Sequence, residues 1–331
     1  MTEGARLPHP RDTAPGDVPD IVVSGEVVAD LIAAAAQPEI YRFHVGGQGA
    51  NVAHALARLG LPTTLLMPLS RDALGERFLT ALSAAGVRLP LAASSDMPTS
   101  VPLVSLQEGQ PRYSLYRDGV ADRDLRHEQI LAALPRHPAV HVLGAFCYAV
   151  EPDRSFWLRI ADESRRRGAL LSSDPNIRAA VMDRAGETPA GMLRALRESD
   201  IVKASDEDLA WLFPGVDSEV AAARLFDGSR TRLVVLTAGD RGSVLLTRSS
   251  RARVPSRPAR PFVDAVGAGD TYHAALLQGL MRAGVRTANQ LSELTTDTLA
   301  AVGRMASLAA SLTCERSGCE PPSSDRIAAA R

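Results

Sequence analysis

The chain has 331 residues, of which 45% are hydrophobic and 23% are charged, which is enough to bury a large α/β core and excludes a fibrous or structureless protein. Its formal net charge of −1 gives none of the basic field that nucleic-acid binding usually requires, so we expect no nucleic-acid partner. Three cysteines without CxxC or zinc spacing, and the lack of a signal peptide or of an apolar run of about 18 residues, predict a cytoplasmic protein with no membrane partner.

Residues 1–19 are rich in proline and charge, and we predict that they form a disordered tail before a domain that spans residues 20–328. In that domain short apolar runs alternate with longer helical patterns, which favours a mostly parallel sheet covered by helices on both faces. The predicted strands are Ile21–Ser24, Thr63–Pro68, Ala139–Gly144, Ala169–Ser173, Ile201–Lys203, Arg232–Thr237 and Ser243–Thr247. The predicted helices are Gly49–Leu59, Asp72–Ala85, Asp153–Arg167, Met192–Arg197, Glu207–Phe213, Ala268–Ala283 and Thr295–Thr313.

Two segments interrupt this alternation, at residues 29–45 and 99–120. Each contains an extended stretch, and the second includes the period-two run Arg112-Tyr-Ser-Leu-Tyr116. We interpret both as strands outside the main sheet, which together can form a small β lid over a cleft.

The strongest local motif is Asp264-Ala-Val-Gly-Ala-Gly-Asp270, which is followed by an amphipathic run. Gly267, Ala268 and Gly269 are small, so the amides at the start of the helix can approach an anion closely and stabilise charge on a transferring phosphoryl group. Asp270 would then accept the proton of an incoming hydroxyl. The alternative is a structural glycine turn in which Asp270 only caps the helix.

A second glycine motif, Gly46-Gly47-Gln48-Gly49-Ala50-Asn51, opens an earlier predicted helix. Paired glycines expose backbone amides to a small polar ligand, and Asn51 offers both a donor and an acceptor to sugar hydroxyls. The motif has neither the glycine spacing of a dinucleotide site nor the lysine of a P-loop. A purely structural turn is the competing interpretation.

The two motifs lie about 220 residues apart, and in this order they resemble those of the ribokinase-like (PfkB) carbohydrate kinase family. The resemblance runs from Ile21 to about Ile327, and it implies a Rossmann-like, doubly wound α/β domain with a β-sheet lid. It also implies ATP and Mg²⁺ as cosubstrates, with Asp270 as the catalytic base. Asp30, Gly46, Gly47 and Asn51 are implied to hold the sugar.

Further residues gain a predicted role through the same resemblance. Arg178, in Asp174-Pro-Asn-Ile-Arg178, is similar to an arginine that reaches the ATP phosphates, although a surface ion pair is the alternative. The nucleotide-binding positions implied are Lys203, Ser205, Thr237, Gly239, Gly242, Val266, Gly267 and Gly269. Mg²⁺ support is assigned to Asp208 or Glu207, because Ser205 and Asp208 replace the family's usual asparagine and glutamate. A monovalent cation, K⁺, is implied near Asp264 and Val266.

The run from Tyr116 through Arg117 to Asp122 resembles the lid segment of fructokinases, so fructose is the first substrate prediction and Arg117 a predicted sugar contact. Ribose, a 2-keto-3-deoxy sugar acid and a nucleoside remain alternatives. A non-catalytic sugar-binding regulator on a kinase scaffold is an alternative of another class, and the intact Asp270 motif argues against it. Exposed lid strands also suggest a homodimer formed through the lid.

Overall fold

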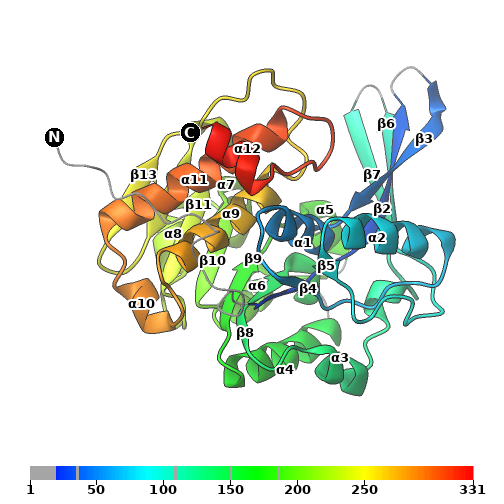
Figure 1. The fold of residues 1–331 in the computed structure, drawn as a ribbon, viewed down its shortest axis with the longest axis horizontal. Coiled ribbons are helices and arrows are strands. Elements are labelled where there is room, and N and C mark those ends of the chain that lie inside the picture. The colour runs from blue at the N-terminus through cyan, green and yellow to red at the C-terminus, as the bar shows by residue number, and fades with distance from the viewer. Residues whose placement is uncertain (1–19, 35–36, 108–109, 150, 185, 331) are drawn as a thin grey trace.

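The computed structural model describes residues 20–34, 37–107, 110–149, 151–184 and 186–330 (Figure 1). The predicted disordered tail, residues 1–19, lies outside the described residues. Among the residues described, no helix is long and apolar enough to cross a membrane.

The core of the molecule is a nine-stranded sheet with the strand order β13-β12-β11-β10-β9-β8-β1-β4-β5. Its strands are β1 (Asp20–Ser24), β4 (Thr63–Leu65), β5 (Val87–Arg88), β8 (Pro138–Gly144), β9 (Leu170–Asp174), β10 (Ile201–Ser205), β11 (Leu233–Thr237), β12 (Ser243–Leu246) and β13 (Arg251–Val254). In this spatial order, every neighbouring pair from β11 across to β5 is parallel. Strands β12 and β13 continue the sheet beyond β11 with antiparallel pairing. Near-continuous apolar runs such as Leu233–Leu236 suit strands that are buried on both faces.

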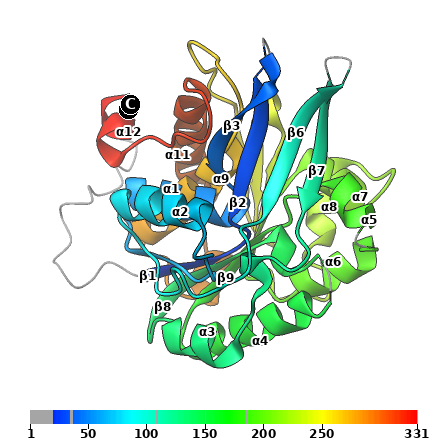
Figure 2. The same cartoon turned by 90° about the vertical axis from the view of Figure 1, so that its right-hand side faces the viewer.

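Helices cover both faces of this sheet. In Figure 2 the helices α1 (Gln48–Arg58), α9 (Ala268–Arg282) and α11 (Thr296–Cys314) lie on one side, and α3 (His127–Ala133), α4 (Asp153–Arg166) and α6 (Pro189–Leu196) lie on the other. The remaining helices are α2 (Ala73–Ala84), α5 (Ala179–Arg184), α7 (Asp206–Leu212), α8 (Ser218–Arg224), α10 (Ala288–Ser292) and α12 (Ser324–Ala329). Short 3₁₀ turns occur at η2 (Ala121–Arg123), η3 (Ala145–Cys147) and η4 (Gly239–Arg241).

A second, four-stranded sheet stands apart from the first at one end of the molecule (Figures 1 and 2). It consists of two hairpins, β2 (Val28–Ala34) with β3 (Gln37–Gly46), and β6 (Val101–Gln107) with β7 (Gln110–Tyr116). The hairpins join through parallel pairing of β2 with β6, which leaves β3 and β7 as the edges. The two interrupting segments of the sequence therefore form one small sheet outside the main one, as predicted.

The predicted fold class is confirmed, and the differences are local. The predicted strand Thr63–Pro68 ends at Leu65, and the predicted helices shift at their ends by one to three residues. The sequence analysis missed β5, β13, α3, α5, α8, α10 and α12.

Candidate active site

The amino-terminal end of α9 carries the predicted base. The chain reaches it through Gly267, whose φ of 72° lies in the left-handed region and whose α-hydrogen faces Cys319, so that a Cβ at this position would overlap the Cys319 sulfur. The Asp264 carboxylate fixes the preceding loop by accepting the backbone N–H groups of Val266 at 2.9 Å and Gly318 at 2.8 Å. The first amides of a 15-residue helix are thereby held beside Asp270, where the helix dipole favours an anion.

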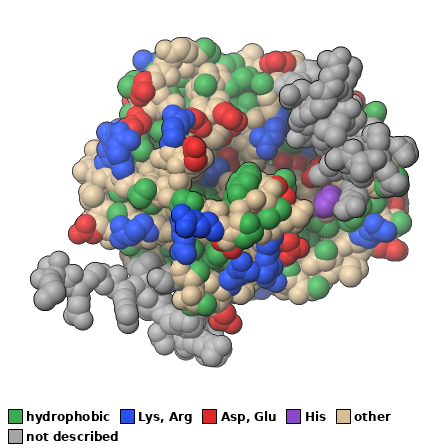
Figure 3. All heavy atoms as spheres, turned by 90° about the horizontal axis from the view of Figure 1, so that it is seen from above, with side chains coloured by type: hydrophobic (Ala, Val, Ile, Leu, Met, Phe, Trp, Pro, Cys, Tyr) green, Lys and Arg blue, Asp and Glu red, His purple; other side chains and the backbone are tan. Residues whose placement is uncertain are grey.

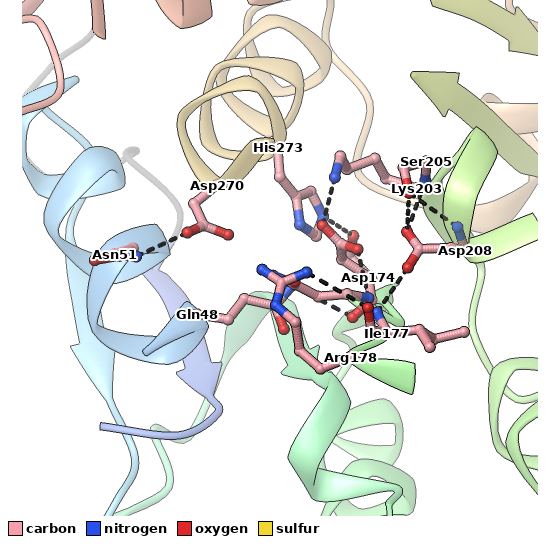
Figure 4. A network of polar contacts seen from close by, with 12 residues as sticks. Gln48, Asn51, Asp174, Ile177, Arg178, Lys203, Ser205, Asp208, Asp270 and His273 are labelled. Carbon is pink, nitrogen blue, oxygen red and sulfur yellow. Dashed lines mark hydrogen bonds and ion pairs between the residues drawn. The ribbon is translucent and has the colours of Figure 1, made fainter. Parts of the chain in front are cut away.

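Asp270 is buried, and its carboxylate accepts a hydrogen bond from Asn51 Nδ2 at 2.8 Å (Figure 4). Burial raises the pKa of Asp270 to about 7, and the nearby Asp174 and Glu26 act in the same direction. The Asn51 hydrogen bond and the Lys203 charge oppose this rise in pKa. Asn51 belongs to α1, so the two glycine motifs of the sequence meet in space as one site.

A buried ion pair lies near Asp270. Lys203 Nζ, on β10, is 2.6 Å from Asp174 Oδ2 at the end of β9 (Figure 4). A Cβ placed on Gly269 would lie 3.3 Å from the same Nζ, so Lys203 approaches the start of α9 closely. Lys203 is therefore an internal cation between Asp174 and the turn that the sequence predicts to bind an anion.

The predicted sugar-binding residues gather at the base of the small sheet. Asp30 lies on β2 with Oδ2 packed against Gly46, where a Cβ would overlap the carboxylate. Gly47, with a φ of 91°, packs in the same way against the backbone carbonyl of Glu26. Burial and the Glu26 charge raise the pKa of Asp30 to about 6, and Arg178 opposes that rise.

The two predicted arginines differ in their surroundings. Arg178 is exposed at the carboxyl end of β9, and Figure 4 shows it among the side chains of the cluster, where its charge acts on Asp30. Arg117 follows β7 and is mostly buried, with Nη2 donating to Asp122 Oδ2 at 2.7 Å and the guanidinium 4.3 Å from the centre of the Phe146 ring. Its predicted contact with the sugar stays a prediction.

The predicted nucleotide positions follow the ends of β10 and β11. Ser205 caps α7 by accepting the Asp208 amide at 3.0 Å, and Asp208 Oδ2 accepts in return from the Ser205 amide at 2.7 Å. Thr237 ends β11 and precedes the turn with Gly239 and Gly242. A Cβ on Gly242 would overlap the Val254 carbonyl, so close backbone packing explains this glycine.

The donor set at the predicted metal positions suits a partly hydrated cation. No group of three or more His, Cys, Asp or Glu residues in the described part of the chain forms a metal cage. Asp208 is buried, and Oδ1 accepts the Ile177 amide at 2.6 Å while Oδ2 accepts from Ser205, whereas Glu207 is exposed at the start of α7. Because Mg²⁺ in kinases keeps several waters and uses phosphate oxygens with one or two carboxylates, this set of residues fits it.

Seen from above in Figure 3, acidic and basic side chains gather around a hollow at this end of the molecule. Sequence reasoning missed three contributors to the site: Glu26, Asp174 as the partner of Lys203, and Gln48, whose Nε2 donates to the Asp174 carbonyl at 3.3 Å. Asp174 and Gln48 lie inside motifs that were noted, so a polar residue at a strand end was the available signal. For Glu26 the available signal was an acidic residue two positions after the end of the first strand.

A comparison with models of protein families assigns this fold and this site to one class of enzyme. The model of the pfkB family carbohydrate kinases matches residues 18–326, nearly the whole chain. The chain belongs to this family, and the protein is a sugar kinase.

Proteins similar to this chain in sequence include two fructokinases. It is 32% identical over 251 residues to a fructokinase of Rhizobium leguminosarum bv. trifolii, with 76% of each chain covered. It is also 32% identical over 273 residues to fructokinase-1 of Oryza sativa subsp. japonica, covering 80% of this chain and 84% of that one.

Solved structures share the fold. A fructokinase with bound ATP from Xylella fastidiosa superposes with a TM-score of 0.83 at 21% identity, covering 93% of this chain and 97% of that one. A fructokinase from Vibrio cholerae O395 in a fructose, ADP and calcium ion bound form has a TM-score of 0.78 at 25% identity, covering 94% and 98%.

Proposed function

We propose that this sugar kinase transfers the γ-phosphoryl group of ATP to a hydroxyl of fructose. The observation that carries the proposal is Asp270, a buried carboxylate beside the first amides of α9, held by Asn51 at 2.8 Å. The fructokinase relatives at 32% identity support fructose as the substrate. The fructokinase-like run from Tyr116 to Asp122 supports it as well.

In the proposed reaction Asp270 accepts the proton of the sugar hydroxyl while that oxygen attacks the γ-phosphorus and the bond to the β,γ-bridging oxygen breaks. The proton then leaves Asp270 for solvent, and ADP departs. A pKa of about 7 leaves Asp270 ionised in about half of the molecules at neutral pH and makes it basic enough to take a proton. The amides from Gly267 to Gly269 donate to the charge that develops on the phosphoryl oxygens.

Residues on either side of Asp270 would hold the two substrates. Asp30, Gly46, Gly47 and Asn51 bind sugar hydroxyls, with Arg117 as a further predicted contact. For ATP the proposed residues are Arg178, Lys203, Ser205, Thr237, Gly239, Gly242 and Val266. Mg²⁺, held by Glu207 or Asp208 through water, would neutralise phosphate charge, and K⁺ would bind backbone oxygens near Asp264 and Val266.

Release of ADP, measured by a coupled assay with fructose, ribose, 2-keto-3-deoxygluconate and adenosine, tests the substrate. We expect the highest kcat/KM with fructose. A preference for another compound in this panel would move the substrate assignment to that compound. A sugar-binding protein that releases no ADP with any of them would instead be the non-catalytic regulator.

The role of Asp270 is tested by Asp270→Asn, which keeps the shape of the side chain and removes the base. We expect kcat to fall by roughly 10²–10⁴, the usual contribution of a positioned general base. Circular dichroism and ATP titration serve as controls, because folding and nucleotide affinity should persist. Near-normal turnover in this folded variant would falsify the assignment.

We also propose that the enzyme forms a homodimer through its small sheet. The edge strands β3 and β7 carry exposed apolar side chains, Tyr41 and Tyr116, that suit pairing with a second copy. Light scattering of the purified protein would then give the mass of a homodimer, and a monomer at all concentrations would contradict this. We expect the enzyme in the cytoplasm, where ATP is available.

A further inference from the structure

A buried histidine lies one turn beyond the proposed base on α9. His273 follows Asp270 by three residues, and both side chains point from the helix toward the polar cluster (Figure 4). The His273 side chain is fully buried, and burial lowers its pKa to about 3, so the ring is neutral. The proposed reaction does not use this ring, and a buried polar side chain needs a partner that explains it.

Among the described residues, His273 has one hydrogen-bond partner, which lies on β9. Its Nε2 is 2.7 Å from the Oγ of Ser172, a residue that is also fully buried. In the same part of the chain Nδ1 of His273 has no partner. We therefore expect the proton of the neutral ring on Nε2, which donates to Ser172, because the other tautomer would bury an N–H group without an acceptor.

The contact at Ser172 is one of two by which β9 reaches α9. Asp174 lies two residues further along β9, on the same face of the strand, and its ion pair with Lys203 brings Nζ close to Gly269. The two strand positions are about 7 Å apart along β9, and the helix positions of Gly269 and His273 are about 6 Å apart along α9. The spacings match, so the two contacts together seat the start of α9 on β9.

We propose that His273 is a positioning residue, which through its hydrogen bond to Ser172 seats the first turns of α9 on β9 and so fixes the place of Asp270. The inference rests on the proposed function in one respect, because it takes Asp270 as the base. Without the hydrogen bond Asp270 keeps its carboxylate but loses its place relative to the sugar hydroxyl. A displacement of about 1 Å can lower a rate by about 10²-fold.

Two single variants break the hydrogen bond from opposite sides. His273→Leu fills the space without a donor, and Ser172→Ala removes the acceptor. Each should lower kcat at least about tenfold, with the KM for fructose and for ATP within about threefold of wild type, because both substrates still bind while the base is displaced. The double variant should have a kcat within about twofold of the more impaired single variant, because both changes break the same contact.

A conservative variant tests whether the donor itself matters. The side-chain amide of His273→Gln can also donate to Ser172, so this variant should recover most of the kcat that His273→Leu loses. A role limited to filling space would make the leucine variant the better enzyme of the two.

The other face of the sheet offers a matched control. His141, on β8, is also fully buried, and its Nδ1 is 2.7 Å from the Oγ of Ser164, on α4. Helix α4 lies on the side of the sheet opposite to α9 (Figure 2). His141→Leu and Ser164→Ala therefore introduce the same kinds of buried defect away from Asp270, and below their melting temperatures they should keep kcat within about twofold of wild type.

Amide hydrogen exchange in the absence of substrates gives a second measurement that does not depend on turnover. The Thr271 amide donates to the Gly267 carbonyl at 2.8 Å and closes the first turn of α9. It should exchange at least about tenfold faster in His273→Leu and in Ser172→Ala, and at the wild-type rate in the two control variants.

Wild-type kcat in both single variants, or wild-type exchange at Thr271 in both, would overturn the proposal. So would an equal loss of kcat in the controls, which would mean a general loss of stability, or a lack of recovery in His273→Gln. A wild-type enzyme that phosphorylates none of the sugars would reject the proposed function. In that case exchange at Thr271 still decides whether His273 holds the start of α9.

Discussion

The pKa of Asp270 is set by effects that oppose each other. Burial at the start of α9 raises its pKa to about 7, and the negative charges of Asp174 and Glu26 add to the rise. Asn51 and Lys203 favour the ionised form and limit it. The balance leaves a carboxylate that is basic enough to take a proton and is still ionised in a large fraction of molecules near pH 7.

The hydrogen bond from Asn51 can be removed on its own. In Asn51→Ala the ionised form of Asp270 loses a donor, so the pKa of Asp270 should rise and the acid limb of the kcat–pH profile should move to higher pH. The sugar KM should rise as well, because Asn51 is a proposed sugar contact. The profile is measured at saturating substrates, with Asn289→Ala, at an exposed position on α10, as the control. An unshifted acid limb would show that Asn51 does not influence the pKa of Asp270.

At the scale of single residues, the sequence predicted what its glycine motifs carry. Asp270, Asn51 and the small residues around them were identified, and the structure brings the two motifs together. The ion pair of Lys203 with Asp174 was not predicted, because it depends on the register of β9 against β10 rather than on spacing along the chain. Glu26 was missed as well, because the Gln48 amide that it accepts lies 22 residues further along the chain, at the start of α1.

At the scale of elements, the start of α9 explains why its two glycines differ. Gly267 has a φ of 72° and faces Cys319, whereas Gly269 has an ordinary helical conformation, and a Cβ there would meet only Lys203 Nζ, at 3.3 Å. Backbone conformation and space both require glycine at position 267, whereas at position 269 the remaining reason is the proposed approach of a phosphoryl group.

This difference gives a prediction about two alanine variants. Gly267→Ala should lower the melting temperature clearly, because it combines left-handed strain of about 1 kcal/mol or more with an overlap at Cys319. Gly269→Ala should change stability little and lower kcat, because its Cβ narrows the space beside the amides. Thermal unfolding and steady-state kinetics of both variants check this. Equal stability of the two variants, or full activity of Gly269→Ala, would show that the turn does not act as described.

The elements that the sequence analysis missed are short or carry weak patterns. Strand β13 has only four residues, and its outward positions, Arg251 and Arg253, are charged, so the alternation is too brief to stand out. Helices α5, α8, α10 and α12 have five to seven residues, less than two full turns. Such elements form because neighbouring parts of the fold support them, and propensity alone does not specify them.

For the whole molecule, the class of sheet was predictable and its strand order was not. Alternation of strands and helices implied parallel pairing with helices on both faces, and the structure confirms it. The placement of β1 between β8 and β4 depends on which strands meet after long connections. The sequence could indicate that two extended segments lie outside the main sheet, but not that β2 and β6 would pair in parallel to join them.

The cost of keeping Asp270 buried should appear in the stability of the whole protein. The unfolded chain loses this proton near pH 4, whereas the folded protein loses it at about pH 7. Between these values the folded state holds a proton that the unfolded state has lost, so this group's contribution to stability falls as the pH rises from about 4 to about 7.

Asp270→Asn has a side chain at this position with no proton to lose between about pH 4 and about pH 7. Its melting temperature relative to wild type should therefore increase between pH 5 and pH 8, which calorimetry without substrates can measure. An equal difference between the two proteins at both pH values would mean that Asp270 titrates in the folded state as it does in the unfolded one.

Lys203 is the only lysine among the 37 basic residues of the chain, and the fold buries it 2.6 Å from Asp174. Reagents that acylate primary amines therefore have two targets in this chain, the α-amino group and a buried side chain close to Gly269 at the start of α9. We expect mild acylation of the folded protein to add one group, and acylation after denaturation to add two, as mass spectrometry can count. An isotope introduced at lysine would likewise yield one side-chain signal, and that signal would come from the proposed active site, beside Asp174 and Gly269.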